Sequence, residues 1–198
     1  MARPRKNEHI KEELLNAGLE TLLTKGYHGT GIKEVLDKLG VPKGSFYHYF
    51  KSKEMFAAEV VHFYARDLNE RILGVMAGSR KTGLIAIKHA FMLMVEEYRT
   101  GTCGCILGAL ASEISETSEI CRLAILKEVE NWNNMLAALV TQGQKEGVIR
   151  TDLDAQLLAK MLWNCWEGGV LRMKVEASAN AVEDVVNIMF DAILLKRL

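Results

Sequence analysis

The sequence predicts an all-α protein of about nine helices, and three observations carry that prediction. Leu, Ala, Glu, Lys and Met are frequent, whereas only two of the 198 residues are Pro, a composition that favours helices over sandwiches or barrels. Hydrophobic residues make up 49% of the chain, so a sizeable core can be buried. No segment alternates apolar and polar residues between turn signals, as a half-buried strand would.

The first quarter of the chain predicts three helices. Asn7 can cap the first of them, and Gly26 ends it. Gly40 separates the second from the third, and Pro42 stands in the first turn of the third. The expected limits are about 7–26, 31–39 and 42–48.

The rest of the chain predicts six further helices, at about 52–77, 84–99, 105–115, 119–146, 154–176 and 180–196. The last of them carries a wide apolar stripe: Val182, Val185, Val186, Met189, Phe190, Ile193 and Leu194. Such a stripe needs a partner surface, either the core of its own chain or a second copy across a two-fold axis. A homodimer formed by this stripe and part of helix 154–176 predicts that charge at Val186 or Phe190 gives monomers or insoluble protein.

Charge is balanced overall, with 25 basic and 25 acidic residues, but it is unevenly distributed. Residues 1–56 hold ten Lys and Arg against seven Asp and Glu, a net charge of +3, and the remainder carries −3. This favours a polyanionic partner for the first quarter only. The basic start has no apolar stretch behind it, and no run approaches the roughly 18 apolar residues that span a bilayer. We therefore expect a cytoplasmic protein without a membrane partner, whose four cysteines are free thiols.

Residues 46–50 read FYHYF, a run of rings that packing alone does not explain. Phe46 and Phe50 are four residues apart and extend the apolar face of the preceding helix, so we assign them to the core. Tyr47 and His48 then face away, and Tyr49 lies at the margin. Two short helices joined by a tight glycine turn match the helix-turn-helix plan, in which the second helix enters the DNA major groove.

The groups around these rings suit contact with double-stranded DNA. Lysine ammonium groups and a tyrosine hydroxyl can bind phosphate oxygens, a glycine permits close approach, and a helix N-terminus offers free N–H groups. The expected DNA-binding residues are Lys33, Lys43, Gly44, Ser45, Tyr47, His48, Tyr49, Lys51 and Lys53.

The stretch GYHGTGIKEVLDKLGVPKGSFYHYFKSKEMF (26–56) resembles the DNA-binding signature of the tetracycline-repressor (TetR) family of transcriptional regulators. The match runs nearly residue for residue through GVPKGSFYHYFKSKE. The resemblance implies a helix-turn-helix DNA-binding domain over 1–51, an effector-binding and dimerisation domain over 52–198, and a homodimer formed by the last two long helices. Members often carry a hydroxyl residue where this chain has Gly31, so we leave Gly31 out of the DNA-binding set.

Two stretches of the predicted body could sense a small-molecule effector. Cys105 falls at a helix start after a Gly-containing loop, and the positive end of a helix favours the thiolate form. The second stretch, WNCWEGGVLRMK (163–174), supplies Trp163, Trp166, Glu167, Arg172 and Lys174. Both resemble a family branch that answers to electrophiles and unsaturated carbonyl compounds. If the eighth helix lies near the loop before Cys105, its cations, Lys174 above all, stabilise that thiolate. Packing roles for Cys105 and the tryptophans, with a reversible effector, remain the alternative.

Other classes of protein fit less well. The cysteines lack the spacing of a zinc site, no histidine stands near them, and we expect neither metal nor cofactor. A thiol enzyme using Cys105 with His89 would leave the head unexplained, and a helical scaffold would bind neither substrate nor DNA. We expect a regulator rather than an enzyme: a dimeric repressor that an effector releases from a palindromic operator, with an activator as the alternative.

Overall fold

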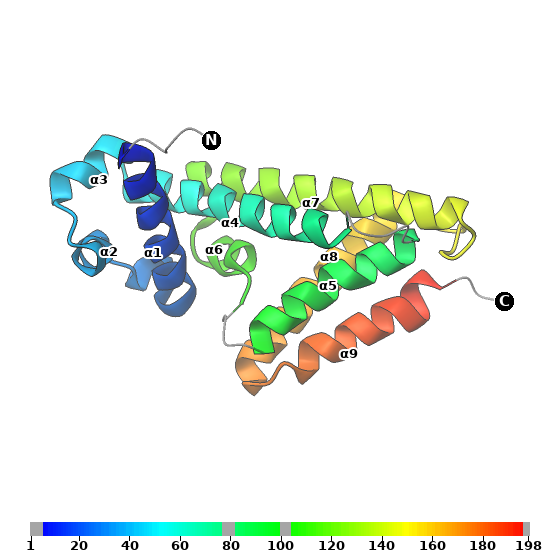
Figure 1. Ribbon diagram of the computed structural model, residues 1–198. Coiled ribbons are helices and arrows are strands. Elements are labelled where there is room, and N and C mark those ends of the chain that lie inside the picture. The colour runs from blue at the N-terminus through cyan, green and yellow to red at the C-terminus, as the bar shows by residue number, and fades with distance from the viewer. Residues whose placement is uncertain (1–5, 77–81, 100–103, 196–198) are drawn as a thin grey trace. The chain divides into compact units, whose positions relative to one another are not determined.

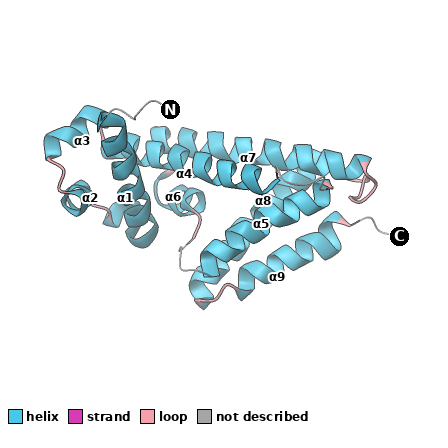
Figure 2. Ribbon diagram, in the orientation of Figure 1, coloured by secondary structure: helices cyan, strands magenta, loops and turns pink. Residues whose placement is uncertain are grey.

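A computed structural model of the protein describes residues 6–76, 82–99 and 104–195. Across these residues the chain is all-α, which confirms the predicted fold class (Figures 1 and 2). The elements are α1 (Lys6–Gly29), α2 (Ile32–Leu39), α3 (Lys43–Tyr49), α4 (Lys53–Met76), α5 (Gly83–Arg99), α6 (Ile106–Ile114), α7 (Glu119–Lys145), α8 (Ala155–Glu176), α9 (Asn180–Ile188) and the π-helix η1 (Met189–Leu194). The predicted limits at residues 77 and 196, the side chain of Asn7, and Cys103 lie outside what is described.

Glycine and capping residues set the helix ends. Gly26 has φ 70° and ψ 179°, which breaks α1 before one last turn. The Ser52 hydroxyl accepts a hydrogen bond from the N–H of Met55 at 3.1 Å, so the predicted cap of α4 is confirmed. At α8 the Asp154 carboxylate accepts from the N–H of Leu157 at 3.1 Å. These local signals are why the helix positions follow so closely from the sequence.

The chain groups into two compact units. The first comprises residues 1–67 and 105–128, and the second comprises residues 68–104 and 129–198. Helices α4 and α7 therefore contribute to both. The predicted division after residue 51 concerns function, and it stays a prediction.

An aromatic cluster forms the core of the first unit where α3 meets α4. The rings of Phe46 and Phe50 lie 5.3 Å apart, and each also contacts Phe56, at 5.2 and 4.9 Å. All three side chains are fully buried. The assignment of Phe46 and Phe50 to the core is confirmed, and their burial fixes which side of α3 faces outward.

The second unit packs α9 against α8 and α5, and this corrects one expectation. Val182, Val186 and Met189 are fully buried within their own chain. The stripe on α9 therefore meets its own core, and a charge at Val186 would disrupt the protomer rather than an interface. Gly169 permits the close packing, because a Cβ there would lie 3.1 Å from a methyl group of Val185.

The predicted last helix changes geometry near its end. Its α-helical part stops at Ile188, and residues Met189–Leu194 form the π-helix η1. The i→i+5 spacing of a π-helix places residues five apart on one face. Met189 and Leu194 are five apart and both fully buried, so the wider turn keeps both in the core.

Candidate nucleic-acid interface and effector site

The outward side of α3 carries the polar groups predicted to meet DNA. Tyr47 is 49% exposed, His48, Lys43 and Gly44 are exposed, and Ser45 and Tyr49 are half-buried. The ammonium of Lys43 lies 5.9 Å from the centre of the Tyr47 ring. A Cβ on Gly44 would meet nothing within 4 Å, so backbone can be approached closely there. The structure thus brings six of the nine predicted residues together on one short helix, with Tyr49 as its last residue.

A hollow of about 430 Å³ lies beside α3, between it and α2. Lys33, Lys43 and Tyr47 line it together with apolar side chains and Asp37. Lys33 of α2 is exposed, so its ammonium and that of Lys43 border the same depression. The sequence did not single out Asp37, whose carboxylate also lines this hollow.

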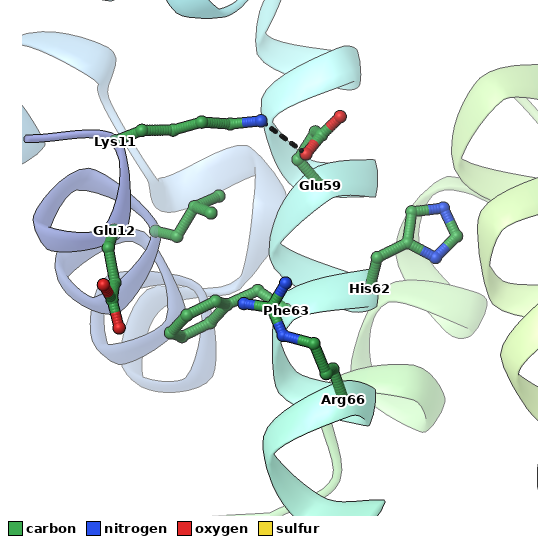
Figure 3. A pocket seen from close by; sticks show the side chains of 7 residues that line it. Lys11, Glu12, Glu59, His62, Phe63 and Arg66 are labelled. Carbon is green, nitrogen blue, oxygen red and sulfur yellow. Dashed lines mark hydrogen bonds and ion pairs between the residues drawn. The ribbon is translucent and has the colours of Figure 1, made fainter. Parts of the chain in front are cut away.

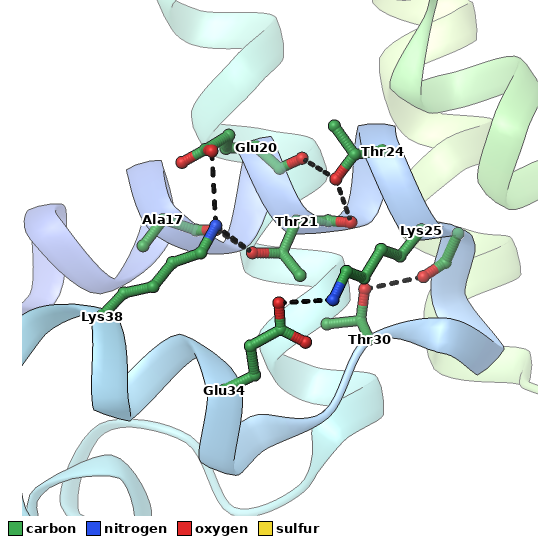
Figure 4. A network of polar contacts seen from close by, with 9 residues as sticks. Ala17, Glu20, Thr21, Thr24, Lys25, Thr30, Glu34 and Lys38 are labelled. Carbon is green, nitrogen blue, oxygen red and sulfur yellow. Dashed lines mark hydrogen bonds and ion pairs between the residues drawn. The ribbon is translucent and has the colours of Figure 1, made fainter.

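Polar contacts hold α2 against α1 and so position the helix-turn-helix (Figure 4). Lys25 of α1 pairs with Glu34 of α2 at 2.7 Å. Lys38 of α2 reaches back to Glu20 at 3.3 Å and to the Thr21 hydroxyl at 3.2 Å. α2 lacks a side-chain cap at Gly31, so these contacts, and the turn before it, orient the helix.

The two lysines around Ser52 differ in their surroundings. Lys51 is exposed, as a phosphate-binding residue should be. Lys53 is half-buried, donates to the carbonyl oxygen of Tyr27 at 2.5 Å, and lies 4.2 Å from the centre of its ring. Burial lowers the pKa of Lys53, and the nearby charge of Glu113 opposes that change. Lys53 was predicted to point at phosphate, but in this structure it joins the start of α4 to the end of α1.

A second, smaller hollow of about 250 Å³ lies between α1 and α4 (Figure 3). Lys11 pairs there with Glu59 at 3.0 Å, and the Arg66 guanidinium lies 5.5 Å from the Phe63 ring centre. His62 points away towards α7, where its Nδ1 lies 2.6 Å from Glu128. The Lys11–Glu59 pair joins α1 to α4 across this hollow, which fits a helix junction.

Cys105 is the N-cap residue of α6 and is buried, with 3% of its surface exposed. Its predicted place at a helix start is confirmed. The Lys174 ammonium lies 2.9 Å from where a Cβ on Gly104 would stand, so this side chain of α8 lies against the residue before Cys105. Gly104 has φ 93°, a conformation that suits glycine.

The remaining cysteines have other environments. Cys121 is fully buried, its sulfur lies 3.4 Å from the Glu54 carbonyl oxygen, and burial raises the pKa of its thiol. Cys165 is half-buried, and Cys103 lies outside the described residues. Thiolate formation is therefore disfavoured at Cys121.

The tryptophans of α8 are core residues of the second unit. Trp166 is fully buried, stacks on Tyr98 with ring centres 5.7 Å apart, and contacts Phe91 at 5.3 Å. Trp163 is 6% exposed and meets Trp132 of α7 edge to face at 5.7 Å. These contacts support the packing alternative for both rings.

The predicted polar sensing residues of α8 have different environments. Glu167 is half-buried and stands one turn beyond Trp163, on the same side of the helix. Arg172 is exposed and pairs with Glu176, its Nε 2.9 Å from the carboxylate.

Sequence reasoning missed Trp132, whose buried indole N–H has no acceptor among the described residues. A buried Trp usually finds a hydrogen-bond partner, and that was the available signal.

No group of three or more His, Cys, Asp or Glu side chains in residues 6–76, 82–99 and 104–195 is arranged to hold a metal ion. Within the same ranges no helix combines the length and apolar character needed to cross a membrane.

Comparisons with known proteins cover nearly the whole chain. The sequence model described as "Bacterial regulatory proteins, tetR family" matches residues 14–60, and "Tetracyclin repressor-like, C-terminal domain" matches residues 81–189. The transcriptional repressor DhaR of Mycobacterium sp. strain GP1 is 30% identical over 185 residues, 93% of this chain and 92% of that protein. The regulator AcuR of Cereibacter sphaeroides is 36% identical over 173 residues, 83% and 76% of the two chains. The crystal structure of reduced Escherichia coli NemR superimposes with a TM-score of 0.85 at 26% identity, covering 96% and 98%.

Proposed function

This chain belongs to the TetR family of bacterial transcriptional regulators, and from that premise we propose that it is an effector-responsive repressor without enzymatic activity. It acts in the cytoplasm, binds a palindromic operator as a homodimer, and leaves the DNA when an electrophile or another small molecule reaches its body. The observation that carries this proposal is the outward face of α3. A helix that buries Phe46 and Phe50 and exposes Tyr47, His48 and Lys43 is built to meet an external polyanion.

The exposed residues divide into two roles on the DNA. Tyr47, Lys33 and Lys51 contact phosphates, which fixes the register of the protein without reading sequence. Lys43 and His48 stand where base edges of the major groove are reached, and they set preference. Lys53 supports the head from inside through Tyr27, so its effect on affinity is indirect.

DNA selection followed by sequencing tests this function directly. Purified protein should enrich a near-palindrome whose half-sites lie about one helical turn or a small multiple apart. On that operator Tyr47→Phe should weaken binding at every sequence, whereas His48→Ala should change the preferred bases. Enrichment of no common sequence by the wild type, or a Tyr47→Phe variant with unchanged affinity at moderate salt, would contradict the placement of α3.

The proposed dimer interface is the exposed face of α8 rather than the stripe of α9. Four apolar side chains on this helix are exposed at helical spacing: Leu157, Met161, Leu171 and Val175. Gly168 is exposed on the same stripe, and a Cβ there would meet nothing within 4 Å, so a partner helix could approach closely. Pairing this stripe with its copy across a two-fold axis would remove apolar surface from water on both protomers.

The effector acts at Cys105 in the first form of the proposal. A thiolate at the N-terminus of α6 adds to an unsaturated carbonyl compound: sulfur bonds to the β-carbon, and the α-carbon takes a proton from water. The side chain of Lys174 lies against Gly104, the residue before this cysteine. The related NemR structure is of a reduced form, which supports a redox-sensitive group here.

A reversible effector is the second candidate, and one observation favours it. The buried indole N–H of Trp132 lacks an acceptor among the described residues. Burying such a donor without a partner costs free energy, which an oxygen of a bound carbonyl or carboxylate compound would recover. In either form the effector releases DNA only if it binds the two conformations of the dimer with different affinities.

A further inference from the structure

Glu113, near the end of α6, reaches the end of α1 in the DNA-binding head. Its Oε2 accepts hydrogen bonds from the backbone N–H of Tyr27 at 2.7 Å and of His28 at 3.3 Å. Helices α1 and α6 pack against each other within the first unit. Neither the DNA-facing residues nor the thiol at the other end of α6 uses this carboxylate.

The break at Gly26 makes the contact possible. Its φ of 70° strains any L-residue, and a Cβ there would lie 2.4 Å from Oε1 of Glu113. The break also turns two backbone donors towards α6, and a carboxylate is a strong acceptor for such groups. Gly26 is thus required both by its conformation and by the closeness of Glu113.

A cation holds the same peptide from the opposite side. Lys53, the first residue of α4, donates to the carbonyl oxygen of Tyr27 and lies over its ring. The charge of Glu113 raises the pKa of Lys53 against the lowering caused by burial, so the two groups act on each other. Burial raises the pKa of Tyr27 to about 12, so its hydroxyl stays neutral. Tyr27 is therefore fixed from α6 and from α4 at once.

Residues 26–30, which Glu113 and Lys53 hold in place, lead directly into the helix-turn-helix; we call these contacts the clamp. The Thr30 hydroxyl donates to the Gly26 carbonyl oxygen at 2.7 Å, and the Thr30 N–H donates to Tyr27 at 3.3 Å. The next residue, Gly31, is the N-cap of α2 and supplies no side-chain cap. The direction in which α2 leaves this turn thus depends on residues 26–30, and α3 follows α2 after a short connection.

We propose that Glu113 couples the position of α6 to the geometry of the DNA-binding head. The coupling rests on the proposed function, since it needs DNA release to be controlled from the start of α6. A helix of nine residues rises about 1.5 Å per residue and moves as a rigid rod. A group added at its first turn therefore displaces the carboxylate at its last turn. The backbone N–H groups of Tyr27 and His28 then lose their hydrogen-bond acceptor, and residues 26–30 become less ordered. Operator affinity falls, because DNA binding must then order these residues.

A double-mutant cycle on the full-length dimer tests the coupling without a known effector. Cys105→Met lengthens the side chain at the start of α6 and stands in permanently for an alkylated thiol. Glu113→Ala removes the clamp, and Glu116→Ala removes an exposed carboxylate just after α6 as the matched control. Operator affinity is measured by fluorescence anisotropy for wild type, each single variant and two double variants, Cys105→Met/Glu113→Ala and Cys105→Met/Glu116→Ala.

If Glu113 couples α6 to the head, the losses of operator affinity caused by Cys105→Met and Glu113→Ala should not multiply in the double variant. Cys105→Met and Glu113→Ala should each weaken operator binding about tenfold, the scale of one charge-assisted hydrogen bond. The double variant should be no weaker than either single one. Glu116→Ala should bind as wild type does and still respond to Cys105→Met. A merely structural Glu113 would instead give an approximately hundredfold loss in the double variant, and that result, or full affinity in Glu113→Ala, would overturn the proposal.

Hydrogen exchange makes the test independent of folding losses and of the operator. The amide protons of Tyr27 and His28 should exchange faster in Glu113→Ala and in Cys105→Met, while those of the α5 core keep their protection. Glu113→Gln retains an acceptor and should show a smaller change than Glu113→Ala. Unchanged exchange at both amides in Cys105→Met would refute the coupling. A wild type that binds no operator would instead refute the proposed function itself.

Discussion

Substituting Leu171 by Glu on α8 should separate the dimer while leaving the protomer folded. Leu171 is 65% exposed in the single chain and Val175 is 81% exposed. Fully burying a leucine side chain contributes about 1.5–3 kcal/mol, so the exposed part of Leu171 accounts for about 1–2 kcal/mol. A two-fold axis buries two copies, which gives about 2–4 kcal/mol, or a dimer dissociation constant raised about 30- to 1,000-fold.

The paired variant Val186→Asp should behave in the opposite way. Val186 is fully buried in its own chain, so an aspartate there would place an uncompensated charge in the core. That costs several kcal/mol, a large share of the roughly 5–15 kcal/mol that hold a domain together. The expected result is loss of helical circular dichroism rather than a folded monomer.

Sedimentation velocity over a range of concentrations, with thermal melting of the same samples, distinguishes the two outcomes. Gln156→Glu, an exposed position about a quarter turn from the stripe, serves as the control and should remain dimeric. The assignment of the interface to α8 fails if Leu171→Glu dimerises as tightly as wild type. A folded, soluble monomer from Val186→Asp would restore the interface on α9.

Two further outcomes are expected. Cys105→Ser should still bind operator but should no longer release it on treatment with N-ethylmaleimide. The control variants should still release the operator: Cys103→Ser, Cys121→Ser and Cys165→Ser. Equal release of operator by wild type and Cys105→Ser at the same dose would show that this thiol is only a packing residue. Trp166→Ala should lower the free energy of unfolding by about 3–5 kcal/mol in urea titrations, because a fully buried ring is lost, and a change below about 1 kcal/mol would contradict its role in the core.

Much of the fold followed from the sequence because its signals are local. Caps, glycines and apolar spacing act within a few residues of one another, so the starts of α4 and α8 could be read directly. The inward placement of Phe46 and Phe50 and the outward placement of Tyr47 follow from the same helical periodicity. The helix-turn-helix, which is built from these short-range features, was therefore predictable in detail.

Several residues of the candidate sites were not predictable from their neighbours in the chain. Lys53 looked like a phosphate ligand at a helix start, but its ammonium bonds to Tyr27, 26 residues earlier. Arg172 and Lys174 are two residues apart, yet one pairs with Glu176 and the other lies against Gly104. A long side chain can reach in many directions, and only the surrounding elements select one.

The sequence by itself determined where the helices run, which face of α3 is apolar, and which family the chain resembles. Only the tertiary structure decided that the stripe of α9 meets its own core, that the exposed apolar stripe lies on α8, and that Glu113 reaches Tyr27 across 86 residues of chain. A hydrophobic pattern indicates that a helix face must be buried, but it does not identify the surface that buries it, because the hydrophobic effect is non-directional. The partner of each face is set by the packing of elements that are distant in the sequence.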